Sequence, residues 1–256
     1  MKVRYIYSAC IEVTTDDLTI LMDPWFTDGI YDGSWYHFPK VDDPFARMSE
    51  PDVIYISHVH PDHYDPVFLK RLFAKFGPKK VVVPDFEQNF LARKAASDGI
   101  EVSPIKELRI GGTEIAIFPN LSGSLSDDDS AILVHDGKNA VLNLNDCGWN
   151  DPHVAEIQAY IKDKNIDLDL LALGFTGAGP YPQTYYDLEE DRETLIAEAA
   201  KKKANFFGRY LRYCEAFPAR HHLPFAGKYI LGSRLAPMND YRGVADPVEV
   251  LAFDPA

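Results

Sequence analysis

The strongest constraint on the fold of this chain is a seven-residue run, Ser57 to His63, that reads Ser-His-Val-His-Pro-Asp-His. Four of its residues can bind a metal ion and fall within six positions, in a chain that has eight histidines altogether. The apolar residues 53–56 before it are typical of a short buried strand. Pro61 then blocks both further strand pairing and an immediate helix. The histidines are therefore expected on a tight loop past the C-terminal end of a strand, where open α/β sheets usually carry their chemistry.

The spacing within this run suits metal binding. His58 and His60 point the same way on an extended chain, because side chains alternate with period two. Asp62 and His63 follow the bend at Pro61 and are expected to face a second point. We therefore expect one metal ion between His58 and His60 and another near Asp62 and His63, with zinc or iron suited to these ligands. The alternative of solvated or capping loop residues explains so dense a cluster poorly.

Strand and helix patterns alternate along the rest of the chain, so composition and periodicity allow α/β or α+β. No second domain is visible, and residues 1–256 are expected to form a single domain. The tail 233–256 either wraps the substrate pocket or ends a chain that is a truncation of something longer. The predicted strands are 3–7, 9–13, 18–22, 81–83, 101–103, 107–110, 114–118, 130–135, 140–144, 168–173 and 221–223, and the predicted helices are 65–76, 86–97, 154–162 and 191–217.

A long connection from Thr27 to Pro51 is rich in aromatic residues, among them Trp35. Loops of this length are usually functional or disordered, and aromatic residues argue against disorder. We interpret the connection as a lid or wall of a substrate pocket, with Trp35 in contact with the substrate. A packed Ω-loop is the alternative.

The stretch 175–184 follows a predicted strand and contains two glycines that allow a backbone to approach a ligand closely. Tyr181 and Gln183 offer hydrogen bonds to a substrate, unless the stretch is only a turn. Arg220 is a candidate contact for an anionic substrate, although a surface salt bridge is the commoner fate of arginine.

Composition limits the classes of molecule that the chain is expected to bind. The net charge of -13 argues against nucleic acid, because phosphate binding needs a basic surface. The chain has only three cysteines, no signal-peptide pattern at its start, and no apolar run near the roughly eighteen residues of a membrane span. We expect a cytoplasmic protein that acts on a small molecule without membrane contact. The oligomeric state is not indicated.

The pattern H-x-H-x-D-H after an apolar strand resembles the signature of the metallo-β-lactamase fold superfamily. Four further segments make the resemblance more particular, and together they are similar to the branch that includes CMP-N-acetylneuraminate hydroxylases. The resemblance implies a four-layered αββα sandwich. These segments are Asp23-Pro24-Trp25, Gly33-Ser34-Trp35, Leu142-Asn143-Leu144-Asn145-Asp146 and Pro224-Phe225-Ala226-Gly227.

The resemblance also implies roles for two aspartates. Asp146 would be a metal ligand that bridges two ions, and Asp23 would support the histidine loop by hydrogen bonds. Two histidines that the superfamily pattern includes are missing here. Segment 118–129 has none, and Asn120 or one of the aspartates 127–129 is the candidate substitute. Ala226 stands where the last histidine is expected, with His221 and His222 nearby.

We therefore predict a metal-dependent hydrolase with one or two zinc or iron ions, in which Asp62 orients a metal-activated water or takes its proton. The sequence does not identify the substrate, and phosphorylated compounds and sugar nucleotides fit the resemblance. One alternative is an iron-dependent oxygenase, or a component of one, that acts on a sugar nucleotide with a separate electron donor. Another is a relative that binds ligands without catalysis after losing metal ligands.

Overall fold

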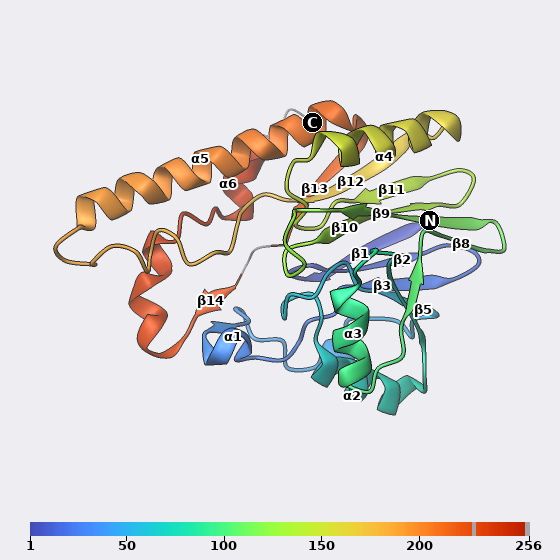
Figure 1. Cartoon of the computed structure of the whole chain (residues 1–256), viewed down its shortest axis with the longest axis horizontal. Helices are drawn as coiled ribbons and strands as arrows, with labels where there is room; N and C mark the ends of the chain where they lie inside the picture. The colour runs from blue at the N-terminus through green and yellow to red at the C-terminus, as the bar shows by residue number, and fades with distance from the viewer. Residues whose placement is uncertain (227–228, 254–256) are drawn as a thin grey trace.

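Two six-stranded β-sheets pack face to face, and helices cover their outer faces (Figure 1). The computed structural model describes residues 1–226 and 229–253. Gly227 of the Pro224–Gly227 segment and the last three residues of the tail lie outside this part. The predicted four-layered αββα sandwich is confirmed, and it resolves the choice between α/β and α+β in favour of a mixed arrangement in which parallel and antiparallel strands share each sheet.

The first sheet is built from the N-terminal part of the chain. It begins as an antiparallel meander and continues with parallel strands, whose crossovers include helices α2 (Pro66–Phe76) and α3 (Phe90–Ser97). Its strands, in spatial order, are β1 (Lys2–Tyr7), β2 (Cys10–Thr14), β3 (Thr19–Met22), β5 (Val53–Tyr55), β6 (Lys80–Pro84) and β7 (Ser103–Ile105).

The second sheet mirrors this plan, with α4 (Asp151–Asp163) and α5 (Arg192–Ala216) on its outer face (Figure 1). Strands β11, β12 and β13 run parallel, and β8 to β11 form an antiparallel meander. In spatial order the strands are β13 (Ala219–Phe225), β12 (Leu168–Gly174), β11 (Ala140–Asn143), β10 (Asp129–His135), β9 (Thr113–Asn120) and β8 (Glu107–Ile110).

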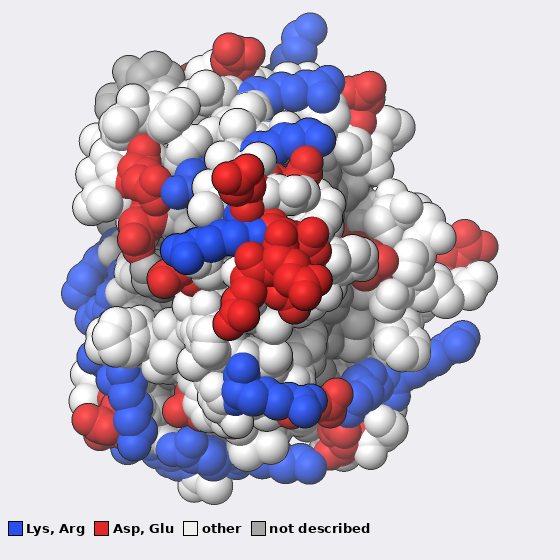
Figure 2. Space-filling view, turned by 90° about the vertical axis from the view of Figure 1, so that its left-hand side faces the viewer, with Lys and Arg blue, Asp and Glu red and all other residues white. Residues whose placement is uncertain are grey.

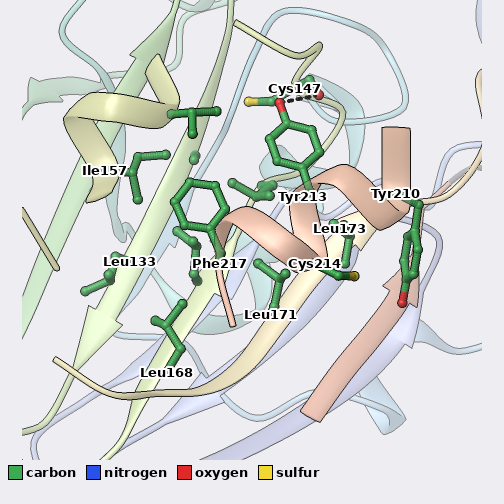
Figure 3. Packing of buried hydrophobic residues seen from close by; sticks show 14 of the residues in the cluster. Leu133, Cys147, Ile157, Leu168, Leu171, Leu173, Tyr210, Tyr213, Cys214 and Phe217 are labelled. Atoms are coloured by element: carbon green, nitrogen blue, oxygen red, sulfur yellow. Dashed lines mark hydrogen bonds between the residues drawn. The ribbon is translucent and has the colours of Figure 1, made fainter. Parts of the chain in front are cut away.

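The unbroken apolar runs of the central strands have a direct cause, because both faces of each sheet are covered. In β5, Ile54 packs toward α2 and α3, whereas Tyr55 packs against the other sheet. In β10, Leu133 packs toward α4 and α5, and Ile132 packs between the sheets. Figure 3 shows the outer layer of the second sheet, where side chains of α4 and α5 meet those of β10 and β12.

Most predicted elements are confirmed within a few residues, and the largest difference is at α3. This helix begins at Phe90 rather than at residue 86. Asn89 sets the start, because its Oδ1 accepts a hydrogen bond from the Ala92 N–H and its Nδ2 donates to the Pro84 carbonyl. An asparagine that satisfies the first turn in this way is a strong N-cap.

The aromatic connection of residues 27–51 is partly regular. It contains α1 (Ile30–Gly33), β4 (Trp35–Tyr36) and the short 3₁₀ helix η1 (Pro44–Ala46). Strand β4 pairs with β14 (Ile230–Leu231) near the C-terminus, followed by η2 (Ser233–Tyr241) and α6 (Pro247–Leu251). Gly232 lies so close to the Tyr36 ring that a Cβ would come within 2.4 Å of it. The connection and the tail therefore form one wall, at the left of Figure 1.

Within the described residues, no helix is both long enough and apolar enough to cross a membrane.

Asp65 joins α2 to the start of the aromatic connection. Its carboxylate is 3% exposed and accepts hydrogen bonds from the backbone N–H groups of Phe26, Thr27 and Phe68. Asp65→Ala is expected to lower the free energy of unfolding by about 2–4 kcal/mol. It removes an N-cap and leaves buried backbone N–H groups without a hydrogen-bond partner. Urea unfolding measures the change.

Asp43 provides the matched control, because it caps η1 from an exposed position. Asp43→Ala should cost about 0.5–1 kcal/mol, the low end for an N-cap, because the carboxylate is exposed. Equal losses in the two variants would show that burial of the Asp65 carboxylate contributes nothing beyond capping.

Candidate metal centre

The parallel strands of both sheets end at a common edge, and the residues that follow them meet there. His58 and His63 follow β5, and Asp146 follows β11. One ligand atom from each of these three residues lies within 4.8 Å of the others. The His63 Nε2 and Asp146 Oδ2 atoms are 3.5 Å apart, close to the separation of about 3.4 Å between two ligands on a tetrahedral zinc ion.

Asp23 holds the histidine loop from below, as the resemblance implies. The chain turns sharply here with a φ of 43°, directly after β3. The fully buried carboxylate accepts hydrogen bonds from the N–H and Oγ of Ser57, at 2.8 and 2.7 Å, and from His63 Nδ1 at 2.9 Å. This contact fixes the orientation of the His63 ring, leaving Nε2 free to face Asp146.

A second carboxylate, that of Asp129, does the same for His58. Asp129 was named only among the candidate substitutes for a missing ligand, and this supporting contact was not predicted. Asp129 Oδ1 lies 3.1 Å from His58 Nδ1, and Ser57 Oγ lies 2.9 Å from the same atom. His58 Nε2 is 2.9 Å from His60 Nδ1, so these two rings are close together as expected. The signal for Asp129 was available in the sequence, because Asp129 and Ser130 are polar residues that open an otherwise apolar strand.

Asp127 is the aspartate of segment 127–129 that lies nearest to His60, with 3.6 Å between Asp127 Oδ1 and His60 Nε2. Asp128 instead accepts hydrogen bonds from Ser122. Asn120 is fully used, since its amide donates to the Gly148 carbonyl and accepts from Asn150. Of the candidate substitutes for the missing histidine, Asp127 is thus the one placed to share a metal ion with His60.

Asp62 occupies the mouth of the site. Its Oδ2 is 3.7 Å from His63 Nε2, and its Oδ1 accepts a 2.8 Å hydrogen bond from the Tyr31 hydroxyl. Tyr31 was not among the predicted site residues. No local pattern marks it, because its position depends on left-handed backbone at Tyr31 and Asp32 in the aromatic connection.

Neither histidine of β13 lies at the end of the strand, where the missing last histidine is expected. His222 pairs in register with Leu171, and its ring centroid lies 6.5 Å from that of Tyr210 on α5. Ala226 stands at the end of this strand with a φ of 59°, and its N–H donates to the Ser8 carbonyl. His221 pairs in register with Leu170, well before the end of the strand, and its side chain is exposed. The parallel register therefore removes His221 as a ligand, since the site lies at the opposite end of β13.

The carboxylates create a strongly negative potential around the imidazoles. Burial lowers the pKa of His63, but Asp23, Asp62 and Asp146 raise it by more, to well above its ordinary value. Burial likewise raises the pKa of Asp146, but the neighbouring His63 brings it below the usual range. Burial and then His58 lower the pKa of His60. The arrangement favours a cation at Asp146 and keeps His60 neutral, which is the form that binds metal.

A cavity of about 510 Å³ opens beside these residues. Its lining includes His60, Asp62 and Asp146, together with two predicted substrate contacts, Trp35 and Gln183. Two other predicted contacts are corrected. The Tyr181 hydroxyl donates to Glu198 of α5, and Tyr181 does not line this cavity.

Arg220, predicted as a contact for an anionic substrate, also lies away from the cavity. It lies near the start of β13, at the end of the strand away from the site, and pairs with Asp169 at 2.9 Å. Its side chain is 69% exposed, so the surface salt bridge is what the structure shows.

The donor set fits a metal ion. Two imidazoles and a carboxylate converge, and Asp23 and Asp129 orient the two rings. The grouping differs from the expected one. The sequence pattern assigned His58 and His63 to two different ions, whereas the structure brings their rings together at one point. The roles of His58, His60, Asp62, His63 and Asp146 as ligands remain predictions.

Comparison with known proteins gives one family and several distant relatives. The family model of the beta-lactamase superfamily domain matches residues 2–161. The human "Inactive cytidine monophosphate-N-acetylneuraminic acid hydroxylase" is 24% identical over 241 residues, which cover 90% of this chain and 45% of the human protein. The chain therefore spans less than half the length of this relative.

Two solved structures share the fold. A mutant of the CmlA beta-hydroxylase matches with a TM-score of 0.58 and 20% identity, over 97% of this chain and 48% of the other. The isothiocyanate hydrolase from Delia radicum gut bacteria matches with a TM-score of 0.61 and 15% identity, over 99% of this chain and 91% of the other. At these identities the similarity concerns the fold alone.

Asp23→Asn is expected to weaken zinc binding about 10–100-fold, because the charge that orients His63 is lost while the shape is kept. Competition with a chromogenic chelator measures the dissociation constant. Asp28→Asn is the matched control, since Asp28 pairs with His37 at 2.7 Å outside the site. Zinc affinity that changes equally in both variants would contradict the role given to Asp23.

Proposed function

Since the chain belongs to the beta-lactamase superfamily domain family, we propose that it is a metal-dependent hydrolase that acts on a small molecule in the cavity beside Asp62. The observation that carries the proposal is the convergence of His58, His63 and Asp146 within 4.8 Å, next to a cavity of about 510 Å³. Titratable groups held by buried partners at the edge of a pocket are typical of catalytic sites. The fold also suits a hydrolase, since the isothiocyanate hydrolase shares it along nearly the whole chain.

The triad His58, His63 and Asp146 would hold the metal, and His60 with Asp127 would complete it or hold a second ion. A zinc or iron ion bound there lowers the pKa of a coordinated water to about 7. Asp62 would orient that water and take its proton. Because Asp62 Oδ1 accepts the Tyr31 hydrogen bond, Oδ2 is the atom left for the proton.

A specific observation also favours a second function. Two histidines and one carboxylate form the ligand set that suits non-haem iron, and the human relative and CmlA are both named hydroxylases. In this case the protein would be an iron-dependent oxygenase acting on a sugar nucleotide. The three cysteines lie far apart in the sequence, so a Rieske-type electron donor would be supplied by another protein or by a part outside this chain.

His63→Ala and Asp146→Ala are expected to reduce bound zinc to a small fraction of the wild-type amount, because each removes a third of the triad. Elemental analysis of the purified full chain measures the content. His221→Ala is the matched control and should leave both metal content and activity unchanged. Metal retained in the first two variants would contradict the proposed centre. An unmodified chain that folds but never holds stoichiometric metal would favour a binding function without catalysis.

Asp62→Asn separates chemistry from metal binding. It is expected to keep most of the zinc, since the triad does not include Asp62, and to lower kcat about 10²–10⁴-fold through loss of the proton acceptor. Steady-state kinetics beside elemental analysis measures both. An unchanged kcat would show that Asp62 takes no proton.

Oxygen consumption distinguishes the two reaction classes. The hydrolase proposal predicts turnover by the zinc-loaded chain in the absence of oxygen. It also predicts that the iron-loaded chain, given a reductant and a CMP-sugar, consumes no more oxygen than the reductant alone. Substrate-dependent oxygen uptake would favour the oxygenase instead.

A further inference from the structure

The cavity beside the candidate metal centre carries negative charge. Its lining includes Asp62, Asp127 and Asp146, and none of its described lining residues is a lysine or arginine. With one divalent ion held by His58, His63 and Asp146, and Asp127 completing that site, the three carboxylates leave a net negative charge. Phosphate groups are usually held by arginine forks or lysine ammonium groups, which this lining lacks.

Arg209 lies near enough to Asp146 to help lower the pKa of that carboxyl, but it is not among the lining residues, and its guanidinium lies 4.4 Å from the Phe206 ring centroid. Two further basic groups behind the cavity wall are engaged by the backbone. Lys202 Nζ donates to the Tyr181 carbonyl at 2.7 Å and lies 3.4 Å from that of Gly179. Arg242 Nη1 donates to the Tyr229 carbonyl at 2.8 Å, and its guanidinium lies 4.6 Å from the Tyr229 ring centroid. Both cations therefore support the backbone of the wall.

Acidic side chains also gather at the middle of the outer face that carries this wall, with lysine and arginine side chains around them (Figure 2). This face is the one that looks to the left in Figure 1, where the start of α5 and the loop before it reach farthest out and η2 and β14 lie behind them. An approaching anion is thus not steered toward the cavity by a continuous basic surface.

Apolar side chains line one part of the cavity, and Trp35, the aromatic one, is held in place by a residue behind it. The Trp35 ring stacks on Tyr229 with centroids 3.6 Å apart and 9° between the planes. Leu231 and Leu235 line the same cavity. A rigid stacked pair with aliphatic neighbours favours a flat apolar group of the ligand.

Gln183 supplies the polar feature of the cavity. The residue is 2% exposed and lines the cavity, and its Nε2 donates to the Gly179 carbonyl at 3.0 Å. Its Oε1 is buried and has no hydrogen-bond partner among the described residues. An unpaired buried acceptor is costly, so a ligand that brings an N–H or O–H group to this atom gains a hydrogen bond.

From these features, and on the premise of the proposed hydrolase, we propose that the substrate is an uncharged amide with a flat apolar group, rather than a phosphorylated compound or a sugar nucleotide. The apolar group would lie against Trp35, and the amide N–H would donate to Gln183 Oε1. The water oxygen bonds to the carbonyl carbon, the C–N bond breaks, and the proton taken by Asp62 passes to the leaving nitrogen. The products are a carboxylic acid and an amine, and the ionised acid is repelled by the cavity.

Binding tests the charge preference independently of turnover. The probes are 4-nitroacetanilide and 4-nitrosuccinanilic acid, which share the scissile bond but differ by one carboxylate, and 4-nitrophenyl phosphate. Quenching of tryptophan fluorescence in the metal-free and zinc-loaded full chain measures each dissociation constant. We expect the neutral anilide to bind at least tenfold more tightly than either anion. Equal or tighter binding of an anion, or no binding of the neutral anilide at any soluble concentration, would overturn the inference.

The Gln183 contact has its own test. Replacing the anilide N–H by CH₂, in 1-(4-nitrophenyl)propan-2-one, should weaken binding about tenfold in the unmodified chain, as expected for a hydrogen bond lost at a buried acceptor. Gln183→Met should bring this ratio close to one. Thr184→Val is the control and should keep the ratio, because the Thr184 hydroxyl already donates to the Pro180 carbonyl. If the ketone and the anilide bind the unmodified chain equally well, Gln183 does not recognise the amide N–H. This result does not depend on whether a variant folds.

Hydrolysis of the neutral anilide by the zinc-loaded chain then separates the two proposals. Preferential binding of neutral probes without release of 4-nitroaniline would leave the substrate class standing and count against the hydrolase. Release of 4-nitrophenol from 4-nitrophenyl phosphate at a comparable kcat/KM would keep the hydrolase and overturn the substrate class.

Discussion

The site depends on one buried carboxylate. Asp23 is fully buried, and a carboxylate in that position is tolerated only when donors surround it. Those donors are the N–H and hydroxyl of Ser57 and the ring of His63, so one charge fixes both ends of the histidine loop. The Asp23 N–H in turn donates to the Tyr55 carbonyl, which ties the carboxylate to the strand that carries the loop. The hydrogen bonds that pair the strands and those that orient the His63 ring therefore belong to one network.

A second network brings Asp146 to the same point from the other sheet. The Tyr55 hydroxyl and the Asn145 amide both bond to Ser130, and the Ser130 hydroxyl donates to the Ser57 carbonyl. All four side chains are buried, so these bonds are shielded from water and break only if the two sheets separate. Segments 73 residues apart in the sequence are thus held in register. The candidate ligands converge because the interface between the sheets is polar at this edge.

The sequence contains the local part of this arrangement. The H-x-H-x-D-H run after an apolar strand was enough to predict the histidine loop, and the family resemblance that it carries implied the sandwich and the hydrogen bonds of Asp23 to that loop. The same resemblance places Asp146 near the histidines, and its role as a ligand stays a prediction. The contacts of Tyr31 with Asp62 and of Asp129 with His58 were not predicted, because each joins positions 31 or more residues apart along the chain. Arg220 failed because a side chain's type does not reveal which end of a parallel strand it occupies. Parallel register decides that, and only the paired strands show it.

The departures from the superfamily pattern share one electrostatic consequence. Where two neutral histidines would complete the ligand set, the described residues place a carboxylate, Asp127, beside His60, and an apolar residue, Ala226, at the end of β13. Replacing imidazole by carboxylate adds negative charge and a hard oxygen donor, which shifts preference toward harder cations and raises the cost of bringing an anion close. Removing the other imidazole leaves a coordination position open. In the proposed function, metal preference and substrate charge are therefore coupled, because the carboxylates that would hold the cation also line the cavity beside it.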